Sequence, residues 1–279
     1  MSFVFDQRAA EHQEAWFNTR AGRAAFSLQK GLVLRLLKPR PRERILDVGC
    51  GTGLYLELFQ QNGLNVTGLE PSLPMLKKAG ERLGHRASLV PGRAEDLPFD
   101  DNEFDIVVLI TSLEFVEDPE SALSEAMRVA QDRIFIGVLN SISLAALARR
   151  VKGFVKNSSV YNQARFFSLW KLMGMLRRRT DPARIRWGSV HLLPPSITHR
   201  VLPFESLKVV QSNPFGAFLG IAADVTYSIR TNNLPVKAKL KLKGQPIPTP
   251  TAYKPGALTS SPRTKKQEKR IKNAGSIAL

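Results

Sequence analysis

Residues 45–53 read Ile45-Leu46-Asp47-Val48-Gly49-Cys50-Gly51-Thr52-Gly53, the pattern of a buried strand that runs directly into a glycine-rich turn. A second apolar strand over 66–69 ends on Glu70. Glycines let the backbone approach a ligand where a Cβ would clash. An acidic side chain at the tip of the next parallel strand can accept hydrogen bonds from two ribose hydroxyls. The two segments together predict a cradle for a nucleoside.

The glycine spacing indicates which nucleoside the cradle holds. The turn is G-x-G-x-G, whereas a dinucleotide site needs a third glycine at the position of Leu54. No Lys followed by Ser or Thr stands at the spacing of a phosphate-binding loop. A nucleoside without phosphates fits this turn better, and S-adenosylmethionine is the obvious candidate.

Three further segments follow the turn in a recognisable order. They are Glu70-Pro71-Ser72-Leu73-Pro74-Met75-Leu76, Gly92-Arg93-Ala94-Glu95-Asp96-Leu97-Pro98-Phe99 and Phe104-Asp105-Ile106-Val107-Val108. With the turn, they resemble the motifs of the class I S-adenosylmethionine-dependent methyltransferases over most of residues 5–230. The similarity is greatest to the type 11 branch, which includes enzymes of the ubiquinone, menaquinone and biotin pathways. The resemblance implies an α/β fold with a Rossmann-like sheet of seven mostly parallel strands, helices on both faces and an antiparallel last strand.

The resemblance also implies roles for single residues. Asp47 is expected to contact the amino-acid portion of the cofactor, and Glu70 the ribose hydroxyls. Met75 and Leu97 are candidates to sandwich the adenine, although Met75 could equally be a core residue. The expected cofactor-binding set is Asp47, Gly49, Cys50, Gly51, Gly53, Glu70, Pro71, Met75, Ala94, Glu95, Asp96, Leu97 and Thr111.

One position departs from the family pattern. Arg93 stands where the family commonly has an Asp that accepts a hydrogen bond from the adenine amino group, and a guanidinium has no acceptor. Either Glu95 or Asp96 takes over this contact, or the backbone around Ala94 does.

The acceptor side of the site is less defined, and no catalytic residue is assigned. Thr111, Ser112 and Glu114 follow the fourth strand, where the family meets its methyl acceptor; capping of the next connection would also explain them. His191 and His199 are candidates for a general base by location only. The single cysteine, Cys50, is expected to fill the turn, and paired thiols for a metal site are absent.

An N-terminal element offers a partial match. Trp16-Phe17-Asn18-Thr19 followed by Gly22 is similar to a segment that closes over cofactor and acceptor in some of these enzymes. A Tyr-Asp pair often precedes that segment, whereas Gln13 and Glu14 stand here. A helix that simply packs on the sheet edge is the alternative.

The alternation of apolar runs predicts parallel βαβ units between residues 44 and 140. The expected strands are 44–48, 66–70, 88–90, 104–110, 133–139, 184–193 and 216–227. The expected helices are an N-terminal region over 5–38, then 53–62, 73–84, 119–131 and two patterns within 141–180. The predicted organisation is an N-terminal segment that covers the site (1–43), a methyltransferase domain (44–230) with a helical lid at about 141–180, and a basic, disordered tail (231–279).

Charge is distributed unevenly along the chain. Residues 1–140 hold 16 Lys and Arg against 20 Asp and Glu, whereas residues 141–279 hold 25 against 4. The excess predicts an anionic partner or substrate for the later half. No apolar run approaches the ~18 residues of a membrane span, and no signal pattern opens the chain, so a cytoplasmic location is expected.

Three functions are compatible with these observations. The first is methylation of a small, lipophilic or anionic acceptor. The second is RNA methylation with the basic half as a phosphate track, although Ile110-Thr111-Ser112-Leu113 does not match the Asn/Asp-Pro-Pro-Tyr motif of nucleobase amino-group methylation. The third is a non-catalytic binding protein, against which the intact cofactor motifs argue. The basic tail could contact nucleic acid or an anionic membrane surface.

Overall fold

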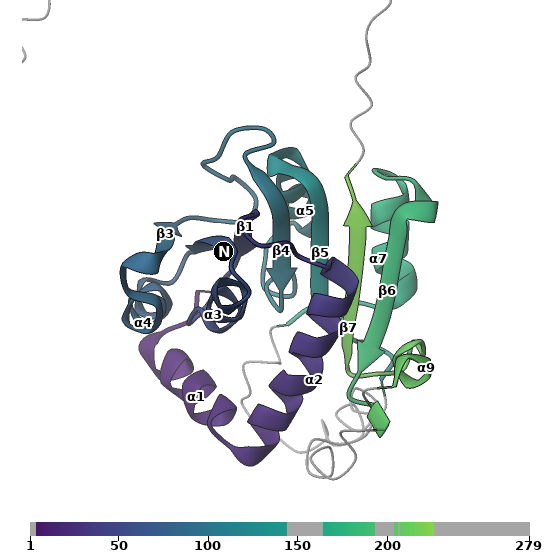
Figure 1. Cartoon of the computed structure of the whole chain (residues 1–279), viewed down its shortest axis with the longest axis horizontal. Helices are drawn as coiled ribbons and strands as arrows, with labels where there is room; N and C mark the ends of the chain where they lie inside the picture. The colour runs from purple at the N-terminus through teal and green to yellow at the C-terminus, as the bar shows by residue number, and fades with distance from the viewer. Residues whose placement is uncertain (1–3, 144–163, 193–203, 206, 226–279) are drawn as a thin grey trace, which may run out of the picture. The chain divides into compact units, whose positions relative to one another are not determined.

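The glycine-rich turn follows an inner strand of one seven-stranded sheet. A computed structural model describes residues 4–143, 164–192, 204–205 and 207–225 of the chain (Figure 1). The strands in these ranges are β1 (Arg44–Val48), β2 (Asn65–Glu70), β3 (Ala87–Pro91), β4 (Phe104–Ile110), β5 (Ala130–Leu139), β6 (Ile185–Val190) and β7 (Phe218–Asp224). Their order is β3-β2-β1-β4-β5-β7-β6, and β7 is antiparallel to both of its neighbours. The predicted fold class is confirmed.

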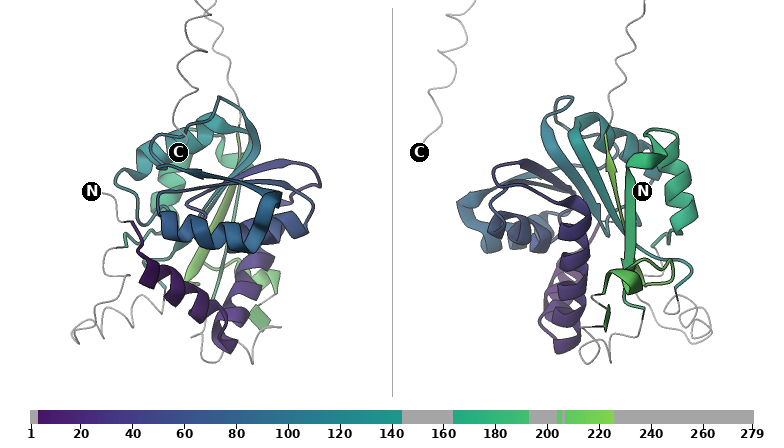
Figure 2. Two further views of the ribbon diagram at one scale, coloured as in Figure 1. Left: turned by 90° about the vertical axis from the view of Figure 1, so that its left-hand side faces the viewer. Right: turned by 45° about the vertical axis from the view of Figure 1, so that its right-hand side comes forward.

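Helices cover both faces of this sheet (Figure 2). The helices in the described ranges are α1 (Gln7–Phe17), which packs on α2 and α4, α2 (Arg20–Leu37), α3 (Leu54–Gln61), α4 (Leu73–Leu83), α5 (Pro119–Val129), α7 (Leu169–Arg177) and the short α9 (Lys208–Gln211). Apolar residues of α2 and α3 form one core cluster with the sheet, and those of α5 and α7 form a second. The sheet is therefore the middle layer of three.

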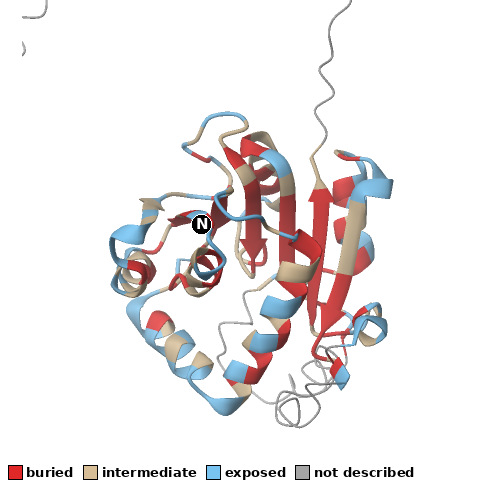
Figure 3. Cartoon of the chain, viewed as in Figure 1, coloured by how far each residue is buried: buried red, intermediate tan, exposed pale blue. Residues whose placement is uncertain are grey.

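The strands are apolar on both faces because both are covered, which Figure 3 shows as red along most of β4 and along the later part of β5. Ile106 and Val108 of β4 pack in the cluster of α2 and α3, whereas Val107 and Leu109 pack in the cluster of α5 and α7. All four side chains are fully buried. The unbroken apolar run of this strand thus follows from its place in the sheet.

Strand direction brings the ends of β1, β2, β4, β5 and β6 to the same edge of the sheet, which we call the carboxyl edge. The expected strand over 184–193 is shorter in the structure. It ends at Val190 because His191 has a φ of +62°, outside the extended range.

The predicted N-terminal helical region is two helices that meet at a sharp turn. Thr19 caps α2, and its hydroxyl accepts from the Gly22 amide at 2.9 Å. A Cβ on Gly22 would lie 2.1 Å from the Trp16 carbonyl oxygen. The Trp16–Gly22 element therefore sets the angle between α1 and α2, and only glycine fits where the two approach.

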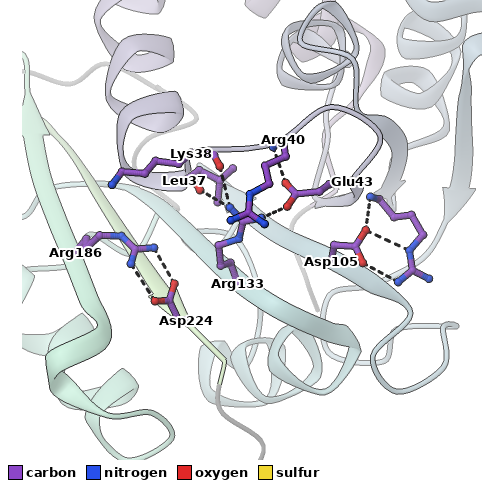
Figure 4. A network of polar contacts seen from close by, with 9 residues as sticks. Leu37, Lys38, Arg40, Glu43, Asp105, Arg133, Arg186 and Asp224 are labelled. Atoms are coloured by element: carbon purple, nitrogen blue, oxygen red, sulfur yellow. Dashed lines mark hydrogen bonds and ion pairs between the residues drawn. The ribbon is translucent and has the colours of Figure 1, made fainter.

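Ion pairs fasten the opposite edge of the sheet (Figure 4). Arg133 of β5 donates to the Leu37 carbonyl at the end of α2 and pairs with Glu43. Arg186 of β6 forms a two-pronged pair with Asp224 of β7, at 2.8 and 3.0 Å. These contacts tie α2 and the last two strands to the sheet, away from the glycine-rich turn.

The segment predicted as a lid is described only in part. The first helical pattern, which begins at Leu144, lies outside the described residues, as does the tail over 231–279. The second pattern is α7, and Ser168 caps it as expected, accepting from the Lys171 amide at 3.3 Å. Leu172 and Leu176 of α7 are fully buried in the core cluster of α5, so α7 belongs to the covering layer of the sheet.

Candidate functional site

The glycine-rich turn folds back over the end of β2. The amides of Gly49 and Cys50 donate to the Leu69 carbonyl at 2.7 and 3.1 Å. Gly49, Gly51 and Gly53 have φ values of +79°, +55° and +79°, which L-residues rarely adopt. The alternating glycines of the motif are thus required by the path of the backbone, and the two side chains between them, Cys50 and Thr52, are buried.

Glu70 connects this turn to the next helix. Its carboxylate accepts from the Gly51 amide at 3.1 Å and from the Ser72 amide at 3.0 Å. The side chain is buried; burial raises its pKa, and the two backbone hydrogen bonds oppose this shift. Each oxygen keeps a second lone pair, so both could still accept from a diol. Glu70 therefore has the position and the free acceptor sites that the predicted ribose contact needs, and the contact itself stays a prediction.

Asp47, near the end of β1, carries a buried carboxyl group with one oxygen that has no hydrogen-bond partner among the described residues. Only 2% of the residue is exposed, and Oδ1 makes no hydrogen bond. Burial, with a smaller contribution from Glu70, raises its pKa to about 8. An unsatisfied buried oxygen beside a glycine-rich turn suits a ligand with a cationic group, and S-adenosylmethionine carries an ammonium and a sulfonium. The residues present fit this cofactor.

The raised pKa of Asp47 predicts how stability depends on pH. The carboxyl group binds its proton more tightly in the folded chain than in the unfolded one, where its pKa is about 4. The free energy of unfolding should therefore fall as the pH rises from about 4 to 8, by at most about 1.4 kcal/mol per pH unit. We expect Asp47→Asn to remove this loss, so that the variant is more stable than the wild type at pH 8. Urea unfolding of the cofactor-free protein at pH 5 and pH 8 tests this; parallel pH profiles for the two proteins would contradict it.

Helix α1 lies against the glycine-rich turn. A Cβ on Gly51 would stand 3.6 Å from Gln13 Oε1, and Glu14 pairs with Arg82 of α4 at 2.6 Å. Arg82 Nε also donates to the Thr52 carbonyl at 3.0 Å. One guanidinium thus joins α1, the turn and α4, three parts that are far apart in the sequence.

Replacing Arg82 should loosen α1 from the site. Arg82→Ala removes the pair with Glu14 and a second one with Glu57 at 3.0 Å. We expect about fivefold weaker binding of S-adenosylhomocysteine, which corresponds to about 1 kcal/mol, and faster proteolysis within α1. Calorimetric titration and limited proteolysis measure both effects. Lys78→Ala, which breaks only an exposed pair with Glu81, is the control and should change neither.

The third motif lies beside the turn that follows β4. The guanidinium of Arg93 pairs with Glu117 at 3.0 Å and approaches Glu95 at 3.7 Å. Glu95 also accepts from the Glu117 amide at 2.8 Å, whereas Asp96 is exposed. Arg93 thus takes part in a surface ion-pair network. Asp96 is the less engaged of the two acidic candidates for adenine.

The backbone is strained at Thr111, the first residue after β4. Thr111 has a φ of +52°, an outlier for a β-branched residue, and its amide donates to the Gly137 carbonyl at 2.7 Å. Ser112 follows, and a Cβ on Gly49 would lie 2.4 Å from the Ser112 Cβ. The Ser112 Oγ is buried without a hydrogen bond. The strained residue thus presses the post-β4 turn against the glycine-rich turn.

Glu114 is the second buried carboxyl group at this edge. Its Oε1 accepts from the Leu139 amide at 2.6 Å, and its Oε2 has no partner. Burial raises the pKa of Glu114 to about 8, against the smaller effect of the Leu139 hydrogen bond. The carboxyl group joins the end of β5 to the turn that follows β4.

Of the two histidines that are candidates for a general base, only His191 is described, since His199 lies outside the described residues. The His191 ring is buried at the end of β6, and burial lowers its pKa to about 4. The backbone of Ala25 lies close enough to oppose this shift slightly, but neither ring nitrogen makes a hydrogen bond of normal geometry. His191 is therefore a neutral imidazole, and its role as a base stays a hypothesis.

The structure brings most of the predicted residues to one place. The ends of β1, β2 and β4 carry Asp47, the glycines, Glu70 and Thr111. Met75, Ala94 and Leu97 are buried, as is Cys50. Pro71 separates Glu70 from the cap of α4. Sequence reasoning missed Arg82, because no local pattern links a helix C-terminus to partners 30 and 68 positions away.

Neither a metal-binding cluster nor a membrane-spanning helix occurs within the described ranges. No cluster of three or more His, Cys, Asp or Glu side chains there could hold a metal ion. None of the helices in those ranges has the length and apolar character that crossing a bilayer requires.

Comparison with known proteins agrees with this geometry. The methyltransferase domain family matches residues 46–133. An uncharacterised protein of Methanocaldococcus jannaschii is 32% identical over 176 residues, 62% of this chain and 78% of that protein. The demethylmenaquinone methyltransferase of Renibacterium salmoninarum is 40% identical over 100 residues, 36% of this chain and 42% of that enzyme. The chain thus spans most of the archaeal relative but less than half of this enzyme.

A solved structure shows the same fold. An S-adenosylmethionine-dependent methyltransferase of Thermotoga maritima, described as a possible histamine N-methyltransferase, is 26% identical with a TM-score of 0.60. The match covers 78% of this chain and 96% of that one. Fold and site together define an S-adenosylmethionine-dependent methyltransferase of class I. The chain belongs to this family, and the domain match places it in the type 11 branch that the sequence motifs resemble. The predicted cofactor is confirmed at the level of the family.

Proposed function

We propose that the protein transfers the methyl group of S-adenosylmethionine to a small acceptor of lipophilic or anionic character. This proposal rests on the contacts that hold the N-terminal segment next to the cofactor turn. Ser72 Oγ donates to the Phe5 carbonyl at 2.6 Å, and the Phe5 ring packs edge-on against Phe115 at 4.9 Å. With Gln13 and Glu14, these contacts bound the site on the side opposite the sheet. Such a site suits a small molecule, or a narrow acyl group attached to a carrier protein.

The residues of the site would act mainly by positioning. The bound cofactor supplies an electrophilic methyl group, and transfer is an in-line displacement from sulfur. In this proposal Glu70 binds the ribose of the cofactor, and the carboxyl group of Asp47 faces its cationic amino-acid end. The glycines of the turn let this end of the cofactor approach the backbone. Thr111 and Ser112 keep the post-β4 turn against the cradle, so that an acceptor beside Glu114 meets the methyl group.

The names of relatives support the class of acceptor. Besides the demethylmenaquinone enzyme, the matches include a ubiquinone biosynthesis O-methyltransferase of Dechloromonas aromatica, 35% identical, and a malonyl-[acyl-carrier protein] O-methyltransferase of Serratia marcescens, 33% identical. Those acceptors are lipophilic or carry a carboxylate. A basic later half, with 25 Lys and Arg against 4 acidic residues, is compatible with an anionic acceptor.

The first test measures the melting temperature of the protein with S-adenosylhomocysteine, with NAD and ATP as controls. At ~100 times its dissociation constant, a ligand adds roughly 2.7 kcal/mol, and the melting temperature should rise only with S-adenosylhomocysteine. Transfer of a labelled methyl group is then measured to a soluble quinol, a malonyl thioester and RNA. Transfer to either small molecule supports the proposal, whereas transfer to RNA alone overturns it.

A further inference from the structure

A basic groove lies on the outer side of the sheet, away from the cofactor turn. It is formed by the last turn of α2, the start of β6 and α9, and has a volume of about 480 Å³. Its lining includes Arg35, Lys38, Arg186, Lys208, Trp187 and Ser212. Three strands, β4, β5 and β7, separate β6 from β1. The groove is therefore not part of the methyltransferase site.

Most of the positive charge in this groove is uncompensated. Only Arg186 has a carboxylate partner, Asp224, among the residues that the structure describes. Arg35 Nε donates to Gln211 at 3.0 Å, but its Nη2 is buried without a hydrogen bond. Lys208 is exposed beside it on α9, and Figure 4 shows Lys38 extending on the side of Arg186. A guanidinium that lines the groove together with two lysines suits an anion such as a phosphate group.

Exposed apolar side chains lie in the same segment of the chain as Lys208 and Ser212, which line the groove. Leu207 and Val209, on either side of Lys208, are 54% and 86% exposed. Phe204 and Phe215 near the two ends of this segment are also about half exposed. The one acidic residue described between 204 and 215 is Glu205, which is buried. Figure 3 shows α9 as exposed surface next to β6. Exposed apolar side chains among unpaired cations are typical of surfaces that meet a lipid interface.

We propose that this α9 surface docks on an anionic membrane. The groove of Arg35, Lys38 and Lys208 holds the phosphate of a lipid headgroup, and Leu207 and Val209 enter the interfacial layer. Charge complementarity selects the occupant, since the cytoplasmic leaflet attracts clustered Lys and Arg. Free phosphate or a nucleic acid would use the cations but leave the apolar side chains in water. The inference is independent of which acceptor is methylated.

Co-sedimentation of the full chain with vesicles tests the proposal. We compare phosphatidylcholine vesicles with vesicles that also contain phosphatidylserine, and expect binding only to the latter, weakening with salt. Lys208→Glu and Val209→Ser should each weaken binding about fivefold or more. Lys77→Glu is the matched control, because it makes the same charge change on an exposed lysine of α4, at the other end of the sheet. It should retain most of the binding.

Several outcomes would overturn the proposal. Equal loss in Lys208→Glu and Lys77→Glu would mean that net charge alone attracts the chain. Wild-type binding by Val209→Ser, together with full competition by inorganic phosphate, would reduce the groove to a simple anion site. RNA binding that depends on Lys208 while vesicle binding does not would assign the surface to nucleic acid. The thermal shift with S-adenosylhomocysteine, run on each variant, confirms an intact cofactor site and keeps this result separate from the proposed function.

Discussion

Glu70→Ala should weaken the binding of S-adenosylhomocysteine by about a hundredfold. Two charge-assisted hydrogen bonds to the ribose, at roughly 1.5 kcal/mol each, would be lost together. The substitution also leaves the amides of Gly51 and Ser72 without an acceptor, so the turn and the start of α4 lose their common anchor. Isothermal titration calorimetry measures the affinity, and far-ultraviolet circular dichroism checks that the fold remains.

Two companion variants separate the parts of this effect. Glu70→Gln keeps one acceptor oxygen for the backbone but has no charge, so an intermediate loss of affinity is expected. Glu81→Ala removes an exposed carboxylate of α4 whose one ion pair within the described residues is with Lys78, and it should bind like the wild type. An unchanged dissociation constant for Glu70→Ala would show that the ribose site lies elsewhere.

Gly49→Ala should destabilise the protein by about 2–4 kcal/mol and abolish measurable cofactor binding. The φ of +79° is unfavourable for alanine by roughly 1–2 kcal/mol. The new methyl group would also stand 2.4 Å from the Ser112 Cβ, so the glycine-rich turn and the post-β4 turn would have to separate. Urea unfolding gives the stability, and calorimetry gives the affinity.

The chain offers both a control and a partial rescue for this variant. Gly31→Ala places a methyl group in the middle of α2 with no atom within 4 Å, and it should stabilise the protein by about 0.5–1 kcal/mol. Adding Ser112→Gly to Gly49→Ala removes the clash but not the backbone strain, so about half of the lost stability should return. If the double variant is no more stable than the single one, the clash is not the cause.

The fold and the cofactor end could be predicted because their signals are local. A buried strand, a glycine turn and an acidic residue at the next strand tip are read within some 25 residues, and four such motifs occur in order. Glycine at positions 49, 51 and 53 reports backbone angles directly, and the structure has all three at positive φ. Strand limits were less accurate where a single residue such as His191 turned the chain.

The contacts that complete the site could not be predicted, because they join distant segments. Arg82 meets Glu14 and Thr52 only after α1 and α4 have packed beside the turn. The unpaired oxygens of Asp47 and Glu114 depend on burial, which a carboxylate in a sequence does not report. The groove beside α9 likewise arises from residues of α2, β6 and α9. The acceptor depends on such long-range contacts, so it was the least defined part of the prediction.

The position of β7 has a consequence for the order in which the chain can fold during synthesis. Among the strands that the structure describes, β7 is the last to be made, yet it lies between β5 and β6 and pairs with both. Until residues 218–224 leave the ribosome, β6 has no neighbour to pair with and β5 presents an open edge. At about 5–20 residues per second, that interval lasts on the order of seconds. The nascent protein must pass through it with an incomplete sheet, so substitutions that slow the docking of β7 should reduce yield more than they reduce the stability of the finished molecule.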